Sequence, residues 1–493
     1  MIYNFNLGIG WASSGVEYAQ IYRARMFRNI GVDAKFVFTD MFPSENMEHM
    51  TKNIGFLDSE VIWLYTFFTD FKTAPVTYTL SDLEKTFTDS NYTKTREGKI
   101  CRYVFGGSNN FYTAYMVNDH DDFVHRVEMV SNGFLIRKDY FTYGRVYSEY
   151  YAPLDNKAHL YHRRFFNENG SVAYEEIIDD DRVMYKFKDK ILCSKEEFVG
   201  YMVSQLHLTK DDVVLIDRST DIGQSIIMNC KPARVGTVVH ADHFSEKDTN
   251  DDYILWNNFY EYEFNMHKHI DFYICSTQAQ SDLMVQQFEK YYGVTPCVYT
   301  IPVGSLPELK YPSSTRKPYS LITASRLASE KHVDWICKAV IQARAEVPEV
   351  SLDIYGEGGE KSKLETIIRD NNASDYIHLM GQHDLSEVYQ NYEAYIAGST
   401  SEGFGLTLME AVGGGLPIIG FDVRYGNPTF IRNGENGYLI SLPEEDKERI
   451  EALRKGIVDL FKQDLEKCHS VSYEVAKDFL TCNVQEKWRE AVC

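Results

Sequence analysis

The chain has 493 residues, of which 44% are hydrophobic and 25% charged, and it carries a formal net charge of −21. This length is too great for one hydrophobic core and predicts roughly two to four domains. The negative charge argues against a broad nucleic-acid-binding surface, although it leaves room for a local basic nucleotide pocket. No apolar window is long enough for a spanning helix, and residues 1–6 lack the features of a secretion signal, so we expect a cytoplasmic protein.

The first elements indicate an α/β domain with an insertion. Residues 1–7 read as a strand, 8–15 as a glycine-containing loop, 16–29 as a helix and 34–39 as a second strand. From about residue 62 to residue 191, short runs rich in Tyr, Phe, Thr and Val alternate with turn signals. That spacing predicts an antiparallel meander.

Strands and helices alternate again after Ser194, with strands expected at 213–217, 234–240 and 269–276. After a linker near 301–307, further strands are expected at 319–324, 351–356, 376–381, 394–398 and 417–422. We therefore assign residues 1–55 and 192–302 to an N-terminal Rossmann-like domain, closed by a C-terminal helix within 476–493. Residues 56–191 form the inserted meander, and residues 303–475 form a second Rossmann-like domain. Ligands are expected beyond the ends of the parallel strands.

Two carboxylates, Glu402 and Glu410, stand eight positions apart around a glycine-rich loop that opens a helix. Amides at a helix start, unobstructed at Gly403 and Gly405, suit a phosphate group. A carboxylate beside such a seat is suited to hydroxyl groups of a sugar or ribose, because it would repel phosphate. The glycines alone are equally compatible with an ordinary turn, and Glu410 alone with a solvated helix face. The string as a whole resembles the E-x7-E signature of retaining glycosyltransferases with the GT-B fold, in which two Rossmann-like domains face each other across a cleft.

Arg326 and Lys331 follow the expected strand 319–324 and lie five positions apart. A planar guanidinium and a compact ammonium beyond a strand end suit a diphosphate, although two solvated basic residues are the alternative. The resemblance implies that Arg326 and Lys331 bind the diphosphate and stabilise the leaving group. It also implies that Glu402 binds the donor sugar and Glu410 the ribose. Further residues that it places around the donor are Gly381, His383, Gly403, Phe404, Gly405, Leu406 and Thr407.

The N-terminal domain supplies weaker candidates. Ser13, Ser14, Gly15 and Val16 begin a predicted helix and could approach the diphosphate. His240 and His243 follow a predicted strand; a lone histidine there is more often structural, but the resemblance favours His240, and secondly His243, as a contact of the donor sugar. The nine cysteines and 14 histidines show no C-x-x-C or H-E-x-x-H pattern, so no bound metal or other cofactor is expected.

The insertion, together with residues 8–19, resembles the catalytic-subunit family of the accessory Sec glycosyltransferase complex. The resemblance implies transfer of N-acetylglucosamine from UDP-GlcNAc to Ser and Thr of serine-rich repeat adhesins. It further implies a non-catalytic paralogous partner, GtfB, bound through the inserted sheet. Peripheral association with the cell membrane stays open.

Two other functions remain open from the sequence: a wall-polymer (teichoic acid) glycosyltransferase, a class that shares a similar inserted sheet, and a catalytically inactive GT-B binding subunit. The intact Glu402/Glu410 and Arg326/Lys331 pairs argue against the inactive subunit. A NAD-dependent dehydrogenase is a poor alternative, because the dinucleotide-binding fingerprint is missing.

Overall fold

The structure is a computed structural model that describes residues 1–9, 15–43, 45–106 and 109–493. Its backbone divides into two compact units: residues 1–24, 32–237 and 258–271 form the first, and residues 25–31, 238–257 and 272–493 form the second. In the described part of the chain, no helix has the length and apolarity needed to cross a bilayer.

Parallel strands open the chain, as the sequence predicts. β1 lies between β2 and β14, and the strands of the first unit follow the order β15-β14-β1-β2-β3. β18 and β19 form a further parallel pair. The strands are β1 (Ile2–Asn6), β2 (Ala34–Phe38), β3 (Val61–Trp63), β14 (Val213–Ile216), β15 (Arg234–Val239), β18 (Phe272–Cys275) and β19 (Val298–Thr300), besides the short pair β16 (Phe244–Ser245) and β17 (Leu255–Trp256).

The helix expected at 16–29 runs from Gly15 to Ile30. All four residues of β14 are buried, as expected for a strand covered on both faces. The helices are α1 (Gly15–Ile30), α2 (Met47–Ile54), α3 (Leu64–Phe67), α4 (Leu80–Glu84), α5 (Lys195–Gln205), α6 (Gly223–Asn229), α7 (Glu261–Asn265) and α8 (Gln278–Tyr292).

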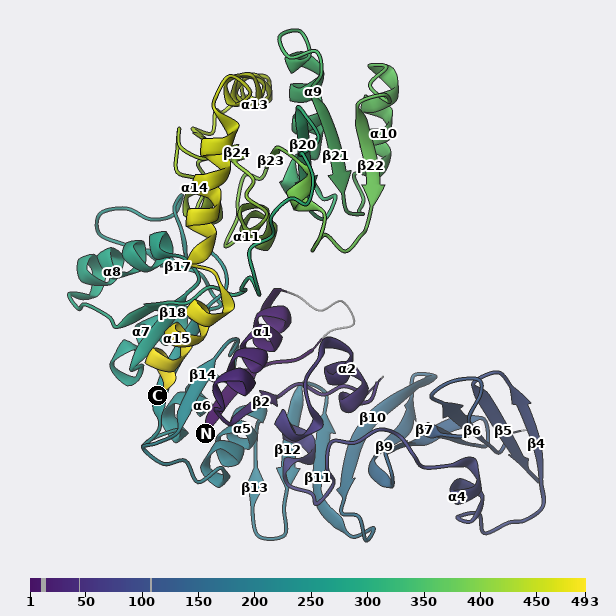
Figure 1. Ribbon diagram of the computed structural model, residues 1–493. Helices are drawn as coiled ribbons and strands as arrows, with labels where there is room; N and C mark the ends of the chain where they lie inside the picture. The colour runs from purple at the N-terminus through teal and green to yellow at the C-terminus, as the bar shows by residue number, and fades with distance from the viewer. Residues whose placement is uncertain (10–14, 44, 107–108) are drawn as a thin grey trace. The chain divides into compact units, whose positions relative to one another are not determined.

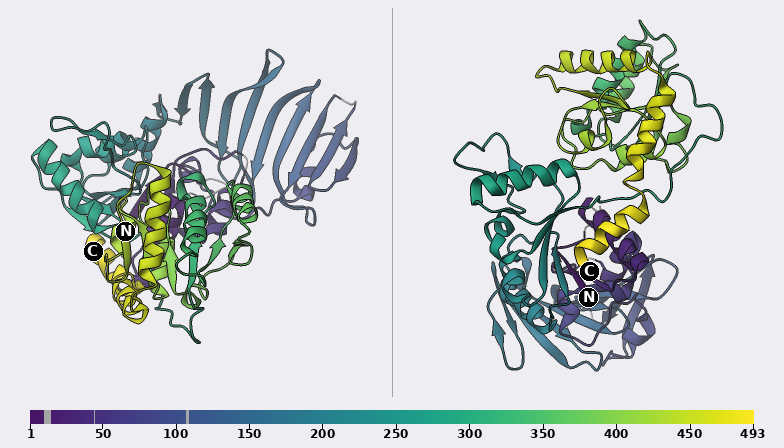
Figure 2. Two further views of the ribbon diagram at one scale, coloured as in Figure 1. Left: turned by 90° about the horizontal axis from the view of Figure 1, so that it is seen from above. Right: turned by 60° about the vertical axis from the view of Figure 1, so that its left-hand side comes forward.

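A ten-stranded antiparallel sheet interrupts the α/β region between β3 and α5 (Figure 1), and its strands lie side by side in one curved sheet (Figure 2, left). Neighbours in the chain are neighbours in the sheet, so the predicted meander is confirmed. The antiparallel strands begin at Tyr92, whereas the sequence predicts a meander from about residue 62. β3, which lies within the range 56–191 assigned to the insertion, pairs in parallel with β2. The strands are β4 (Tyr92–Glu97), β5 (Ile100–Phe105), β6 (Phe111–Met116), β7 (Val124–Ser131), β8 (Phe134–Phe141), β9 (Arg145–Leu154), β10 (Lys157–Phe166), β11 (Val172–Asp179), β12 (Arg182–Lys186) and β13 (Ile191–Leu192).

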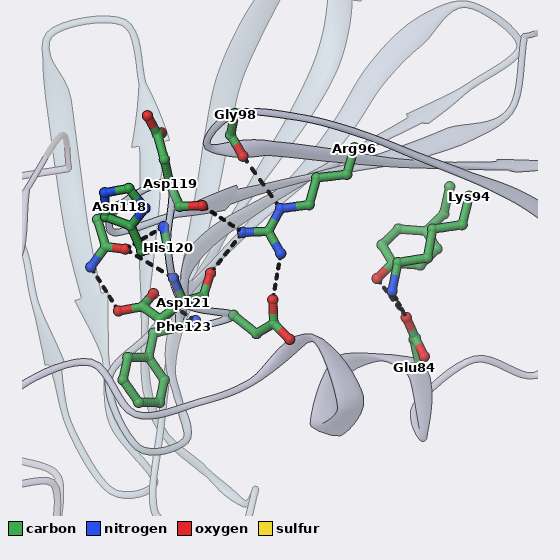
Figure 3. Close-up of polar contacts among 11 residues, drawn as sticks. Glu84, Lys94, Arg96, Gly98, Asn118, Asp119, His120, Asp121 and Phe123 are labelled. Carbon is green, nitrogen blue, oxygen red and sulfur yellow. Dashed lines mark hydrogen bonds and ion pairs between the residues drawn. The ribbon is translucent and has the colours of Figure 1, made fainter.

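Charged side chains fasten the edge strand β4 to its surroundings (Figure 3). The guanidinium of Arg96 donates to the carbonyl oxygens of Asp119 at 3.2 Å and Asp121 at 2.9 Å. It also pairs with the Asp122 carboxylate at 2.5 Å. Lys94 pairs with Glu84 of α4 at 2.7 Å. An edge strand with such basic side chains is a poor template for unspecific strand pairing.

The C-terminal α/β sheet has six parallel strands in the order β22-β21-β20-β23-β24-β25. Successive residues of one strand enter different cores: Leu321 joins a cluster with α9, α10 and α13, whereas Ile322 joins a cluster with α11 and α14. Helices thus cover both faces of the sheet (Figure 1). The strands are β20 (Ser320–Ala324), β21 (Ser351–Tyr355), β22 (Ile377–Gly381), β23 (Ala394–Ile396), β24 (Ile418–Phe421) and β25 (Gly437–Ile440).

The last helix returns to the beginning of the chain. Trp488 of α15 packs edge-on against Phe27 of α1, with ring centroids 5.3 Å apart. The helices of this half are α9 (Val333–Ala343), α10 (Lys361–Asp370), α11 (Leu406–Gly413), α12 (Gly426–Phe430), α13 (Asp446–Leu460), α14 (Leu465–Lys477) and α15 (Thr481–Val492).

Candidate functional site

The loop from Glu402 to Gly405 lies between β23 and the start of α11, as the sequence predicts. Gly405 caps the helix with φ of +90°, and a Cβ at this position would stand 2.6 Å from the Leu408 side chain. Only glycine suits both the conformation and the space. The first amides of α11, those of Leu406 and Thr407, have no acceptor within the helix and are available to an anion.

The backbone of Glu402 is fixed by the loop that follows β24. The amides of Tyr425 and Gly426 donate to the Glu402 carbonyl oxygen at 2.6 and 2.7 Å. A Cβ at residue 426 would stand 2.3 Å from the Phe404 carbonyl oxygen, so the close approach requires glycine. The Phe404 ring is buried against Phe430. Phe404 can therefore meet a ligand only through its backbone.

Lys331 and Glu402, far apart in the sequence, meet in the structure. The Lys331 ammonium lies 2.6 Å from Glu402 Oε2, and the two side chains are 23% and 20% exposed. A turn at His332, with φ of +44°, brings this segment over Gly398. A Cβ at residue 398 would stand 2.8 Å from the His332 carbonyl oxygen. Glycine at the end of β23 thus lets the cation reach the carboxylate.

Arg326 lines a pocket of about 380 Å³ at the carboxyl ends of β20, β21 and β22. Its side chain is 75% exposed and pairs with Glu330 at 2.8 Å. The same pocket includes Thr407, two positions after Gly405. The loop after β20 that carries Arg326 and Lys331, here called the cationic loop, and the start of α11 therefore form two walls of the pocket. The other lining residues are Ala324, Ser325, Tyr355, Gly356, Glu357, Gln382, His383 and Leu385.

Sequence reasoning does not single out three of the residues that line this pocket, Tyr355, Glu357 and Leu385. A signal for the first two is the string Gly356-Glu-Gly-Gly at the end of a parallel strand, where ligands usually bind. A Cβ on Gly356, with φ of +129°, would stand 1.9 Å from the Ser325 carbonyl oxygen. The two loops therefore touch through their backbones.

Glu410 is half-buried on α11, and Tyr389 donates to its Oε2 at 3.0 Å. Burial raises the pKa of the Glu410 carboxyl, and the hydrogen bond from Tyr389 opposes this rise. The site thus holds a carboxylate that gains from further hydrogen-bond donors. Hydroxyl groups of a ligand could supply them.

The two candidate histidines differ in their surroundings. His243 is completely buried, with Nε2 2.7 Å from Gln287 Oε1 and Nδ1 3.3 Å from the Tyr425 hydroxyl. Burial lowers its pKa to about 4, so the ring is neutral at physiological pH. These contacts make His243 a support of Tyr425. His240 is half-buried, and its carbonyl oxygen lies 3.8 Å from the Cβ position of residue 403.

Some expected residues are not among those that line this pocket. Gly15 and Val16 begin α1 in the first unit, and Ser13 and Ser14 lie outside the described residues. Gly381 ends β22, and its carbonyl oxygen accepts from the Gly356 amide at 2.8 Å. Leu406 packs where a Cβ on Gly304 would stand. The roles assigned to these residues stay predictions.

Two domain families match the chain. Residues 93–189 match the GtfA extended beta-sheet domain, and residues 310–478 match glycosyl transferases group 1. The second match contains the cation-bearing loop and both glutamates. The two parallel α/β sheets, the inserted antiparallel sheet and these matches define a glycosyltransferase with the GT-B fold.

The similarity extends over the whole chain. A Streptococcus agalactiae protein described as the GtfA subunit of UDP-N-acetylglucosamine–peptide N-acetylglucosaminyltransferase is 51% identical, over 99% of this chain and 97% of its own length. The crystal structure of a GtfA/B complex contains a chain 52% identical to this one, with a TM-score of 0.96 and coverage of 100% and 99%. The structure of pneumococcal O-GlcNAc transferase GtfA in complex with UDP and GlcNAc is 49% identical, with a TM-score of 0.85 and coverage of 100% and 98%. This chain belongs to the GtfA family.

Proposed function

We propose that this chain transfers N-acetylglucosamine from UDP-GlcNAc to Ser and Thr hydroxyls of a serine-rich repeat adhesin polypeptide, with retention at the anomeric carbon. The observation that carries the proposal is the meeting of Lys331 and Glu402 at 2.6 Å beside the glycine-rich start of α11. A cation for the diphosphate and an acceptor for sugar hydroxyls are thereby adjacent. Relatives of the GtfA family are named for this donor and for a peptide acceptor.

The chemistry requires stabilisation of a leaving diphosphate. The bond between the sugar C1 and the β-phosphate oxygen breaks, and its electron pair stays on the diphosphate. The acceptor hydroxyl attacks C1 from the same face and passes its proton to that phosphate oxygen. Arg326 and Lys331 offset the growing negative charge, which is the main lever for such a step. Glu402 and His240 would orient the sugar, and Glu410 would accept hydrogen bonds from the ribose.

A GtfB-like partner subunit is the second part of the proposal. The inserted sheet carries exposed apolar side chains, among them Phe134, Ile136, Tyr161, Val172 and Ile177. Large apolar groups on one sheet favour a protein partner over solvent. One solved GtfA relative is described as a GtfA/B complex.

The proposal is tested with the full chain, its partner subunit, labelled UDP-GlcNAc and a Ser-rich polypeptide. Label should enter the polypeptide, and UDP-glucose should serve less well. Glu402→Gln should abolish most transfer, whereas Glu474→Gln, which alters a 2.9 Å ion pair on α14, should not. Preferential labelling of a competing polyol-phosphate polymer, or full activity of Glu402→Gln, would contradict the proposal.

A further inference from the structure

A buried tyrosine contacts two walls of the pocket at the carboxyl ends of β20, β21 and β22, but it does not line that pocket. Tyr395 lies on β23, between the strands β20 and β24, and is 2% exposed. Its hydroxyl group donates to the Ala324 carbonyl oxygen at 2.9 Å and lies 3.0 Å from Thr407 Oγ1. The Ala324 amide lies a further 3.3 Å from the same hydroxyl.

Both partners of this hydroxyl line the pocket, one at the end of a strand and the other at the start of a helix. Ala324 ends β20, two positions before Arg326, and Thr407 is the second residue of α11. We propose that Tyr395 is a positioning residue that holds the cationic loop and the start of α11 at the spacing a nucleoside diphosphate requires. The inference rests on the proposed function and adds to it a residue that does not touch the substrate.

Burial gives this contact its importance. The Ala324 carbonyl is buried, so if it loses its partner it cannot turn to water without moving the backbone that carries it. The loops carry the charges and amides proposed for the diphosphate, so a change of their spacing weakens binding. A donor would then have to restore the spacing from its own binding free energy.

The variant Tyr395→Phe removes the hydroxyl and keeps the ring in its core. In the full chain with its partner subunit, we expect the Kd for UDP and the KM for UDP-GlcNAc to rise about tenfold, the loss typical of one or two buried hydrogen bonds. The kcat at saturating donor should change by less than about twofold, because bound donor restores the geometry. The melting temperature without UDP should fall by no more than it does in the control variant described next.

The matched control is Tyr473→Phe. Tyr473 is another tyrosine of this half of the chain, and its hydroxyl bonds to the carbonyl oxygens of Lys310 at 2.7 Å and Gly414 at 3.2 Å. It does not line the pocket. The control should bind UDP like the unaltered chain. Equal weakening of UDP binding by both variants would overturn the inference, since it would indicate a general loss of structure.

A second variant removes the other partner. Thr407→Val should weaken UDP binding to a similar extent, and the double variant should be little worse than either single one, because the two changes break the same contact. If Tyr395→Phe fails to fold, Thr407→Val and Thr407→Ser decide: only the former should lose affinity. Unaltered UDP affinity in folded Tyr395→Phe, or strictly additive losses, would overturn the inference. Failure of the unaltered chain to bind UDP would instead overturn the proposed function.

Discussion

Replacement of Arg326 should affect catalysis strongly and the free energy of unfolding very little. Its side chain is 75% exposed and pairs with Glu330, four positions along the chain. Exposed pairs of this kind contribute about 0.5 kcal/mol or less to folding, so Arg326→Ala should leave the free energy of unfolding nearly unchanged. Loss of a group that offsets charge in the transition state typically lowers kcat by about 100- to 1000-fold. We expect a drop of that size in transfer from UDP-GlcNAc.

The assay follows labelled sugar into a Ser-rich polypeptide, with urea unfolding measured in parallel. Arg369→Ala is the matched control: that side chain is 71% exposed, pairs with Asp370 at 3.1 Å and lies on α10. It should retain full activity. If Arg326→Ala transferred sugar as fast as this control, the guanidinium would not act on the leaving group, and the assignment of the cationic loop would be wrong.

Three further predictions concern the same half of the chain. Because burial raises the pKa of Glu410, the folded state binds a proton more readily than the unfolded state, and stability falls as pH rises through that window. Glu410→Gln should thus unfold at higher urea than the unaltered chain at neutral pH, yet bind UDP about tenfold more weakly; a less stable variant would contradict this. Gly356→Ala should cost about 3 kcal/mol of unfolding free energy and weaken UDP binding, since its Cβ would meet the Ser325 carbonyl oxygen; unchanged calorimetric binding would refute it. The pKa of His243 is lowered to about 4 in the folded chain, so as the pH falls the unfolded chain binds the proton first. The stability that this difference provides above pH 6.5 is therefore lost as the pH falls toward 4. Unfolding free energy should drop by roughly 2 kcal/mol between about pH 7 and pH 5, and His243→Leu should show a shallower dependence.

The fold was largely predictable because its signals are local. Strand periodicity located β20 to β24 and the meander, although β25 was missed, since Gly437–Ile440 is short and partly exposed. The carboxyl ends of parallel strands lie at one edge of a sheet, so residues that follow β20, such as Arg326 and Lys331, are expected near the loop that follows β23. The contact of Lys331 with Glu402 confirms that proximity.

The rest depends on packing that no local pattern encodes. The buried position of His243 between Gln287 and Tyr425 follows from segments that meet only in the folded chain. The same holds for Tyr395, whose neighbours in the sequence read as an ordinary apolar strand. Residue type and spacing identify groups that can do chemistry, but not the groups that hold them.

The backbone crossings at Gly356, Gly398 and Gly426 bear on how this half of the chain folds. Each crossing joins segments separated by many residues, as when the Lys331 turn passes over Gly398. Contacts between distant segments close late, because the entropy of the intervening chain must be lost first. Partly folded molecules should then lack the pocket at the carboxyl ends of β20, β21 and β22. UDP should accordingly slow unfolding, and it should leave the rate of folding almost unaltered.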